Sequence, residues 1–446
     1  MSQTRIVIMG AAGRDFHDFN TVFRGDDRVD VVAFTHTGTQ NVGELDELPN
    51  RRYPSELAGA GYPEGIPIRA ESDLGTIIDE EDVDTVVFSY SDVSHEHVLH
   101  QASRALAAGA DFRLIGPDRM MLHAEIPVVA VDAVRTGCGK SQTARKFADL
   151  LRERGKDVAV VREPMPYGDL VAQQVQRFDS MADLDESNVT IEEREEYEHH
   201  IERGHVVYAG VDYEAILDRA QNEAEIIVWD GGNNELPFYV PDVHVVVADP
   251  YRAGSERRYH PGETNLRFAD YVLINKENTA DAAGIREVEA NAREMNPDAE
   301  IIHANSTITA DRKAIAGKRV LVVEDGPTLT HGDAPSGAGL IAARKYGAGE
   351  IVDPEPVAEG SLQRVFEEYD HLNAVLPAMG YSDEQIRDLE ATIRNAAPEV
   401  VVSGTPHDLA RLIDVECPIV RVRYELEEKD ITLDTVLDRH AQALHL

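Results

Sequence analysis

Runs of Val and Ile alternate with amphipathic segments along almost the whole chain. Most of the apolar runs are unbroken, rather than alternating between apolar and polar positions. An unbroken apolar strand is typical of a parallel sheet that helices cover on both faces. The predicted fold class is therefore α/β. The predicted strands span residues 5–10, 29–36, 85–92, 111–116, 128–133, 157–163, 225–232, 243–250, 271–276, 300–305, 319–326, 400–406 and 418–426.

The pattern also suggests how the chain divides into domains. A boundary lies near residues 117–125, between two strand-like runs. We expect a Rossmann-like N-terminal domain over residues 1–123 and a phosphate-loop nucleotide-binding domain with a mostly parallel sheet over 124–330. We expect residues 331–446 to form a C-terminal α/β extension that continues the second domain.

Polar residues stand where many of these apolar runs end. In parallel sheets ligands bind beyond the carboxyl ends of the strands, so polar ends favour a shared site over generic turns. The strand ends that carry such residues are Asp132, Glu163, Asp230, Asp249, Asn275 with Lys276, and Glu324 with Asp325.

The segment VVAVDAVRTGCGKSQ, residues 128–142, has the order strand, glycine-bearing loop, helix start. Backbone N–H groups of such a loop and of the following helix cradle phosphate oxygens. Lys140 is expected to reach the β- and γ-phosphates, and the Ser141 hydroxyl to bind Mg²⁺. Val134 stands where the first glycine of the motif is usual. The predicted nucleotide contacts in this segment are Gly137, Cys138, Gly139, Lys140, Ser141 and Gln142.

A second acidic motif follows the strand at residues 225–230. Asp230 precedes Gly231 and Gly232, an arrangement that lets an aspartate hold Mg²⁺ while the backbone approaches the γ-phosphate. An ordinary strand-to-turn junction is the simpler alternative. We predict Ser141, Asp230 and Glu163 as metal ligands and Lys140 and Asp230 as catalytic residues.

Asn275 and Lys276 follow the strand at 271–274 and resemble the start of the guanine-reading motif of GTPases. Asn278 replaces the aspartate of that motif. An amide offers a donor and an acceptor where guanine needs a carboxylate that accepts two N–H groups. We therefore expect Asn275 and Lys276 to contact the nucleotide, with ATP the expected nucleotide and GTP an alternative.

Arginines cluster in residues 252–267 of a chain that otherwise avoids positive charge. Arginine forks bind phosphate or carboxylate groups bidentately, so the cluster indicates a polyanionic second substrate. A salt-bridged surface loop remains the alternative for any single arginine. The predicted substrate-binding residues are Arg252, Arg257, Arg258 and Arg267, the first three also catalytic, together with His331 in a glycine-punctuated loop.

Other polar positions leave the choice open. Arg14, His17 and Asn20 follow a Gly10-x-x-Gly13 turn and could face a ligand or pack in a turn. The histidines at 95, 97 and 100 could form a metal pair, although surface histidines at a helix start are the simpler interpretation. The segment IEEREEYEHHIERGH, residues 191–205, predicts a charged helix with a solvated face.

Composition narrows the class of protein. Acidic residues number 82 against 43 basic ones, for a net charge of −39, and only eight residues are lysine. A dispersed acidic surface suits high salt, where screening removes the self-repulsion, so we expect a halophilic archaeon. Without a basic stripe we expect no nucleic-acid partner. No long apolar run, no signal peptide and only two cysteines indicate a cytoplasmic protein without a membrane span.

Several longer stretches together resemble one family, the archaeal cyclic 2,3-diphosphoglycerate synthetases and their relatives described as predicted GTPases. These stretches are GAAGRDFHDFN, RTGCGKSQT, EEREEYEHHIERG, VVYAGVDYEAIL, WDGGNNELPFY, DPYRAGSERRYHPGETNLRFADYVLINK and EDGPTLTHGDAPSGAGLIAARKYGA. They span residues 10 to about 348.

This resemblance implies an ATP-dependent ligase that closes 2,3-diphosphoglycerate to a cyclic phosphoanhydride, releasing ADP and phosphate. It implies that Lys140 and Mg²⁺ act on ATP, that Arg252, Arg257 and Arg258 hold the small phosphorylated metabolite, and that the chain forms a homodimer or larger homo-oligomer. A GTPase, another NTPase or a small-molecule kinase for a different anionic metabolite is the alternative.

Overall fold

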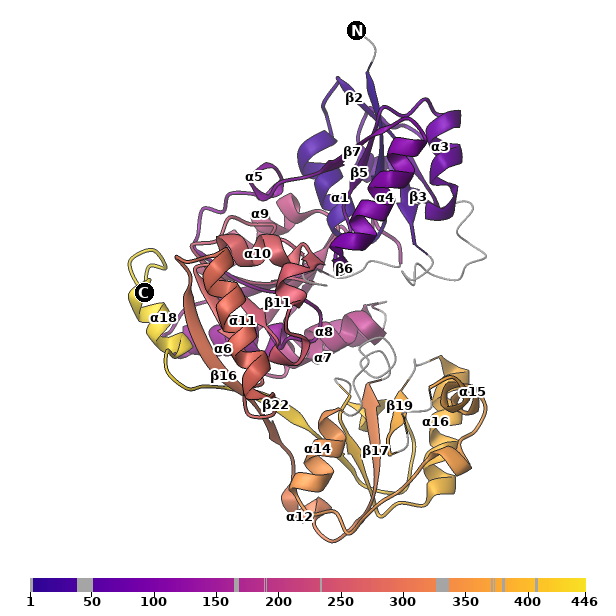
Figure 1. Ribbon diagram of the computed structural model, residues 1–446, viewed down its shortest axis with the longest axis vertical. Helices are drawn as coiled ribbons and strands as arrows, with labels where there is room; N and C mark the ends of the chain where they lie inside the picture. Colours follow the sequence, from indigo (N-terminus) through magenta and orange to yellow (C-terminus); the bar gives the residue numbers. More distant parts are fainter. Residues whose placement is uncertain are drawn as a thin grey trace. The chain divides into compact units, whose positions relative to one another are not determined.

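The computed structural model describes residues 3–37, 51–163, 168–187, 189, 191–232, 235–325, 337–369, 372, 374–378, 382–405 and 408–446 (Figure 1). Contacts divide the chain into two compact units. The first comprises residues 1–305 and 428–446, and the second comprises residues 306–427. Each unit is an α/β structure with a largely parallel sheet, so the predicted fold class is confirmed.

The N-terminal sheet of the first unit has the strand order β3-β4-β2-β1-β5-β7. All of its described strand pairs are parallel except β3 with β4. Chain order reverses at β1, and such a reversal is where doubly wound sheets bind ligands. Its strands are β1 Thr4–Met9, β2 Val29–His36, β3 Arg52–Tyr53, β4 Ile66–Ala70, β5 Thr85–Phe88 and β7 Asp111–Leu114. Its helices are α1 Arg14–Asp18, α2 Ser55–Ala58, α3 Leu74–Glu80, α4 His95–Ala107 and α5 Pro117–Met120.

The larger sheet has the order β10-β11-β9-β12-β8-β13-β15-β16-β22, and its last strand falls almost wholly within the residue bounds of the second unit. β8 lies between β12 and β13, and all six of its residues are buried. The strands are β8 Val128–Ala133, β9 Val158–Arg162, β10 Val175–Phe178, β11 Val206–Gly210, β12 Ile226–Asp230, β13 Val243–Ala248, β15 Tyr271–Ile274, β16 Glu300–Thr309 and β22 Arg423–Glu428. The helices are α6 Lys140–Glu153, α7 Met181–Glu186, α8 Ile191–Ile201, α9 Tyr213–Glu223, α10 Gly262–Phe268, α11 Ala282–Met295 and α18 Leu433–Arg439.

The two sheets of the first unit share one hydrophobic core. The same buried cluster contains Phe16 and Phe34 from the N-terminal sheet and Val128 and Trp229 from the larger one. A short antiparallel pair, β6 Val93–Ser94 with β14 Tyr259–His260, joins them again. The contacts therefore place the residues before and after the suggested boundary near residue 123 in the same compact unit.

The second unit has its own parallel sheet, in the order β18-β17-β20-β21 with β19 also paired to β17. It also has its own hydrophobic core. The contacts thus place residues 306–427 in a separate unit, whereas the sequence pattern suggested continuity with the phosphate-loop part. Its strands are β17 Arg319–Asp325, β18 Glu350–Ile351, β19 Leu376–Ala378, β20 Val400–Ser403 and β21 Ile419–Arg421. Its helices are α12 Arg312–Ile315, α14 Ala338–Lys345, α15 Ser361–Glu368, α16 Asp383–Ala396 and α17 Leu409–Leu412.

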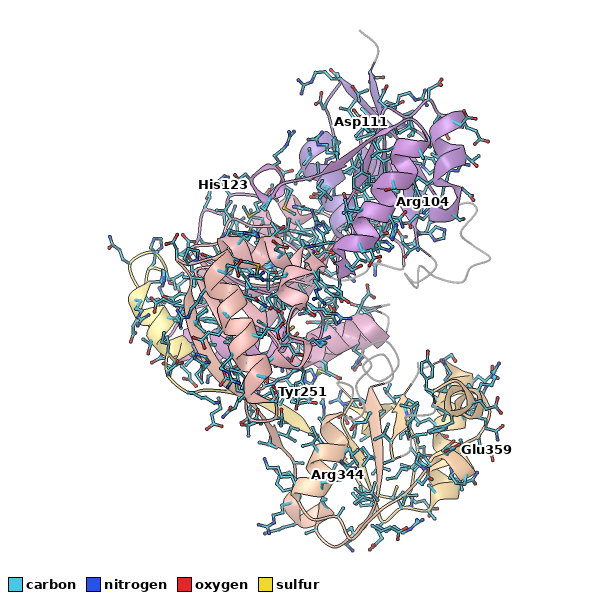
Figure 2. The ribbon with its side chains drawn as sticks, viewed as in Figure 1. Arg104, Asp111, His123, Tyr251, Arg344 and Glu359 are labelled. Atoms are coloured by element: carbon cyan, nitrogen blue, oxygen red, sulfur yellow. The ribbon has the colours of Figure 1, made fainter. Side chains whose placement is uncertain are left out.

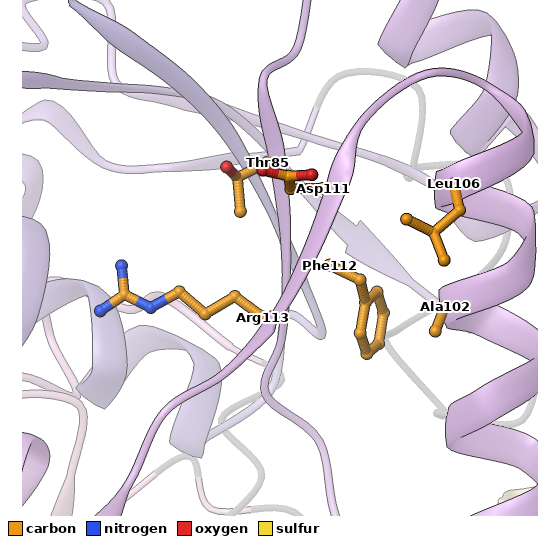
Figure 3. Close-up of a pocket in the computed structure, with 6 residues that line it drawn as sticks. All are labelled: Thr85, Ala102, Leu106, Asp111, Phe112 and Arg113. Atoms are coloured by element: carbon orange, nitrogen blue, oxygen red, sulfur yellow. The ribbon is translucent and has the colours of Figure 1, made fainter.

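The edge of the N-terminal sheet is apolar on one side. Arg104 on α4 and Asp111 on β7 mark this region in Figure 2. A pocket lies there, and Figure 3 shows Phe112, Ala102 and Leu106 on one side of β7 with Arg113 directed to the other. Within the described residues, no helix has the length and apolar character needed to cross a membrane.

Candidate functional site

The phosphate-binding loop connects β8 to α6, as the sequence predicts. Gly137 and Gly139 adopt φ values of 81° and 107°, a region that residues with a side chain rarely occupy. Val134 is the first residue after β8. Its N–H donates to the carbonyl of Val247 at 3.0 Å and its side chain is almost fully buried, so this position is held against β13 although it carries no glycine.

Three side chains hold three successive carbonyls of the loop. Arg252 Nη2 donates to the Thr136 carbonyl at 2.7 Å, and Asn275 Nδ2 donates to the Cys138 carbonyl at 2.9 Å. Lys276 Nζ donates to the carbonyl between them. These bonds fix the direction of three successive peptide groups, and an anion-binding loop needs its peptide groups held in such an order. The Thr136 N–H itself donates to Asp92 Oδ1 at 3.3 Å. Arg252, Asn275 and Lys276 therefore act on the loop itself.

Asp230 is the centre of a buried ionic cluster at the end of β12. Its carboxylate accepts from Lys140 Nζ at 2.8 Å and from His200 Nε2 at 3.0 Å, and it pairs with Arg162 Nη1 at 2.6 Å. Lys140 also donates to the carbonyl of Gly231. Arg162 in turn pairs with Glu196 on α8 at 2.7 Å. Lys140 and Asp230, which the sequence places 90 residues apart, are thus brought into direct contact.

The electrostatics of this cluster follow from burial and pairing. Burial opposes ionisation of Asp230, but Arg162, Lys140 and His200 outweigh it and hold the pKa of Asp230 well below its usual range. Burial lowers the pKa of Lys140 despite the attraction of Asp230. Burial also lowers the pKa of His200 to about 3, so this imidazole is neutral and donates from Nε2. Asp230 therefore stays charged at neutral pH.

Two of the oxygens predicted to bind Mg²⁺ share Arg162 as a neighbour. Ser141 Oγ lies 3.5 Å from Arg162 Nη1, and Asp230 Oδ2 lies 2.6 Å from the same nitrogen, so the Arg162 guanidinium is the cation beside both oxygens. A hydroxyl and a carboxylate, completed by phosphate oxygens and water, form a common Mg²⁺ environment. The Glu163 carboxylate lies elsewhere, against Gly13 and Gly232, where an added Cβ would clash with it.

The remaining predicted substrate residues do not gather around the loop. Arg257 pairs with Glu294 on α11, and Arg267 with Glu263 one turn earlier on α10. Neither has a hydrogen bond or ion pair to the phosphate loop within the part of the chain that the structure describes. The carbonyl of Arg258 accepts from the backbone N–H of His95. His331 lies outside the described residues.

Sequence reasoning missed Arg162 and His200. Arg162 immediately precedes Glu163, and a basic residue at the end of an apolar strand was the available signal. The helix predicted to be solvated, α8, instead turns Tyr197, Glu198 and His200 into the protein, where they are almost fully buried. The many charged residues of this helix suggest a solvent-exposed face. Whether a charged side chain is buried depends on the partners that the fold brings to it, which composition does not show.

The other histidines and polar residues singled out in the sequence have structural partners. His17 stacks on Phe238 with ring centroids 4.0 Å apart, and Asn20 accepts from the Tyr53 hydroxyl at 2.9 Å. His97 Nε2 lies 2.6 Å from the Tyr90 hydroxyl. Among the described residues, no group of three or more histidine, cysteine or carboxylate side chains could hold a metal.

Comparisons with known proteins give one extensive match. No protein-family model matches the chain. A curated protein, the arginine synthetase ArcE of Thermococcus kodakarensis, is 58% identical over 425 residues, which cover 95% of this chain and 94% of the relative.

Solved structures are more distant. LpxK from Aquifex aeolicus, in complex with ATP, gives a TM-score of 0.42 at 12% identity over 72% of this chain and 90% of that one. The hydrogenase maturation factor HypB from Archaeoglobus fulgidus gives a TM-score of 0.27 at 19% identity over 40% of this chain and 81% of that one.

Proposed function

Since the chain belongs to the family of the arginine synthetase of Thermococcus kodakarensis, we propose that it is an ATP-dependent synthetase that forms arginine. The observation that carries the proposal is 58% identity over nearly the full length of both chains. The geometry of the phosphate loop, Lys140 and Asp230 supports the use of a nucleoside triphosphate. ATP is the proposed nucleotide, and GTP is the alternative to be tested.

The chemistry of the product defines the substrates. Citrulline differs from arginine only in carrying a ureido oxygen in place of one guanidinium nitrogen, and that oxygen is a poor leaving group. Transfer of the ATP γ-phosphoryl to the ureido oxygen forms a new P–O bond and releases ADP. Ammonia then adds to the ureido carbon, the C–O bond breaks, phosphate leaves, and the product retains the guanidinium proton. Arginine, ADP and phosphate result.

Residues of the chain have distinct parts in this scheme. The loop, whose carbonyls are held by Arg252, Asn275 and Lys276, binds the β-phosphate through its peptide N–H groups and the start of α6. Lys140 leaves Asp230 to neutralise charge on the transferred phosphoryl group. Mg²⁺ held by Ser141 and Asp230 would supply further neutralisation of phosphate charge. Catalysis of this kind depends on positioning and electrostatics more than on a general base.

The second candidate is the closure of 2,3-diphosphoglycerate to its cyclic phosphoanhydride, favoured by the motifs that resemble that family. The two reactions share one logic, because ATP phosphorylates an oxygen and a second nucleophile then displaces the phosphate. The ion pairs of Arg257 and Arg267 with surface glutamates favour the substrate of lower negative charge. We further propose that the protein is cytoplasmic and forms a homodimer or larger homo-oligomer. Light scattering measures its molar mass in solution and so tests the oligomeric state.

Product analysis distinguishes the candidates. Purified protein in concentrated KCl with Mg²⁺ is supplied with ATP or GTP and either citrulline with ammonium chloride or 2,3-diphosphoglycerate. We expect ADP release to require citrulline and ammonium and to equal the arginine formed. Cyclic diphosphoglycerate in the phosphorus NMR spectrum, without arginine, would establish the second candidate instead.

Lys140→Ala provides the inactive reference. We expect it to lower turnover by about a hundredfold or more while the protein remains folded, because Asp230 keeps Arg162 and His200 as partners. Lys156→Ala, which removes a lysine paired with Glu225 away from the loop, is the matched control and should keep full activity.

A further inference from the structure

A second buried polar cluster lies where α1 meets the end of β9. Arg14 is fully buried, with Nε 3.6 Å from Asp18 Oδ2 and Nη1 3.9 Å from Glu235 Oε2. The Glu163 carboxylate lies against the backbone of Gly13, one residue before Arg14. We call Arg14, Asp18, Glu163 and Glu235 the acidic cluster.

The acidic cluster is short of positive charge. It contains three carboxylates and one guanidinium group, and a fourth carboxylate, that of Asp15, lies beside it. Asp15 has a structural role, since it accepts from the backbone N–H groups of Ala12, Gly13 and Phe16. His260, 3.4 Å from Arg14 Nη1, adds no charge, because burial and Arg14 lower its pKa to about 3.

Carboxylate oxygens of the acidic cluster also lack hydrogen-bond donors, because Arg14 approaches Asp18 and Glu235 only to 3.6 and 3.9 Å. Neither oxygen of Asp18 and not Oε2 of Glu235 has a hydrogen-bond partner among the described residues, although all three atoms are buried. The other oxygen of Glu235 accepts from the Ser91 hydroxyl. Buried carboxylates are normally paired or hydrogen-bonded, so this arrangement is incomplete without a positively charged group.

The acidic cluster adjoins the phosphoryl-transfer site. The Glu163 carboxylate lies against Gly232, two residues after Asp230, and Gly231 between them accepts from Lys140. At the end of β9, Arg162 pairs with Asp230, and the next residue, Glu163, lies against Gly13 at the start of α1. The two sites are therefore adjacent in the chain as well as in space. Glu163 and Glu235 keep exposed fractions of 6% and 5%, whereas Asp18 has none, so the two glutamates are the members that a ligand can reach.

We propose that Glu163 and Glu235 bind a protonated nitrogen of the substrates, either the ammonium ion or the α-ammonium group of the amino acid. Glu235 Oε2, which has no hydrogen-bond partner and lies 3.9 Å from Arg14 Nη1, is one acceptor, the Glu163 carboxylate is the other, and Asp18 adds negative charge from behind Arg14. This inference rests on the proposed synthesis of arginine and assigns one of its substrate sites. A site of this charge selects against a polyanionic second substrate.

Kinetics with volume-conserving variants test the site. Glu163→Gln and Glu235→Gln are expected to raise one KM, that of ammonium or that of citrulline, by about 10- to 100-fold, the range of a charge-assisted hydrogen bond. The substrate whose KM rises identifies the source of the protonated nitrogen. Glu289→Gln, which removes a surface carboxylate paired with Arg293, is the control and should change neither KM.

A binding measurement keeps the inference separate from the activity. Thermal unfolding is followed at one fixed KCl concentration with ammonium chloride, L-citrulline or L-arginine added. We expect at least one probe to raise the unfolding temperature of the unaltered protein, and Glu163→Gln and Glu235→Gln to lose that rise while staying folded. If no probe stabilises the unaltered protein, or if the variants keep both KM values and the full rise, the site is refuted even where arginine is formed. A rise without arginine synthesis would refute the activity alone.

Discussion

At the scale of single residues, two buried carboxylates show how partners decide ionisation. Asp230 has three positive or hydrogen-donating side chains within 3.0 Å, and its pKa falls well below the usual range despite complete burial. Glu235 has the Ser91 hydroxyl and the more distant Arg14, and burial raises its pKa to about 8. The partners of Asp230 keep its carboxylate charged, whereas the Glu235 carboxylate would be stabilised in its charged form by a further positive group.

Stability should therefore fall as pH rises through the range in which the acidic cluster ionises. Burial raises the pKa of Asp18 to about 6 and that of Glu235 to about 8, above the values these groups have in the unfolded chain. A raised pKa contributes stability that is present below the unfolded value and is lost as pH rises through the folded value. We expect Glu235→Gln to remove part of this loss, so that the variant exceeds the unaltered protein by a few kcal/mol near pH 9 and by little near pH 5.

Urea unfolding at a series of pH values, without added substrates, measures this difference. Parallel curves for the two proteins would contradict the expectation. Burial also raises the pKa of Asp15 to about 6. Because both proteins contain Asp15, its contribution to the pH dependence is the same in both and drops out of the difference.

At the scale of elements, the phosphate loop owes its shape to strands other than the one that precedes it. Asn275 and Lys276 follow β15, and Arg252 follows β13, yet all three bond consecutive carbonyls between β8 and α6. The parallel order β8-β13-β15 places these strand ends side by side. Residues expected to read the base or hold the substrate thus support the loop.

Asn275→Ala should weaken nucleotide binding without unfolding the protein. The change removes the hydrogen bond to the Cys138 carbonyl and frees that peptide to rotate, so we expect an affinity for ATP lower by about tenfold. Calorimetric titration with ATP measures the change. Asn222→Ala, in the exposed part of α9, is the control. An unaltered Kd for Asn275→Ala would mean that the loop holds its shape without this contact.

At the scale of the whole molecule, the family and the charge are the dominant facts. The archaeal synthetase family predicted from the motifs is confirmed by the nearly full-length relative, although that relative is named for arginine. Contacts divide the chain into two units, because one core joins the first two sheets and a separate core forms within residues 306–427. The domain boundaries suggested by the sequence stay a prediction. The halophilic origin remains a prediction.

The net charge of −39 predicts a strong dependence of stability on salt. Raising ionic strength from about 0.1 M to about 1 M shortens the Debye length from about 10 Å to about 3 Å, which removes most repulsion between surface carboxylates. We expect the unfolding temperature to rise by several degrees over this range, and NaCl to act nearly as well as KCl because screening does not depend on the cation. Calorimetry at fixed pH measures it, and a flat or falling dependence would count against the expectation.

The sequence by itself determined the α/β class and the phosphate loop, and it singled out Lys140 and Asp230. These follow from local patterns, since an unbroken apolar run makes a buried parallel strand and a glycine loop before a helix makes an anion site. Only the tertiary structure decided that the Val134 N–H bonds to β13 and that Arg252, Asn275 and Lys276 support the loop. It also decided that His200 is buried against Asp230 and that the acidic cluster forms beside Gly232. Each of these depends on which strand ends and helices meet across long separations in the chain, and residue type at one position does not encode its neighbours in space.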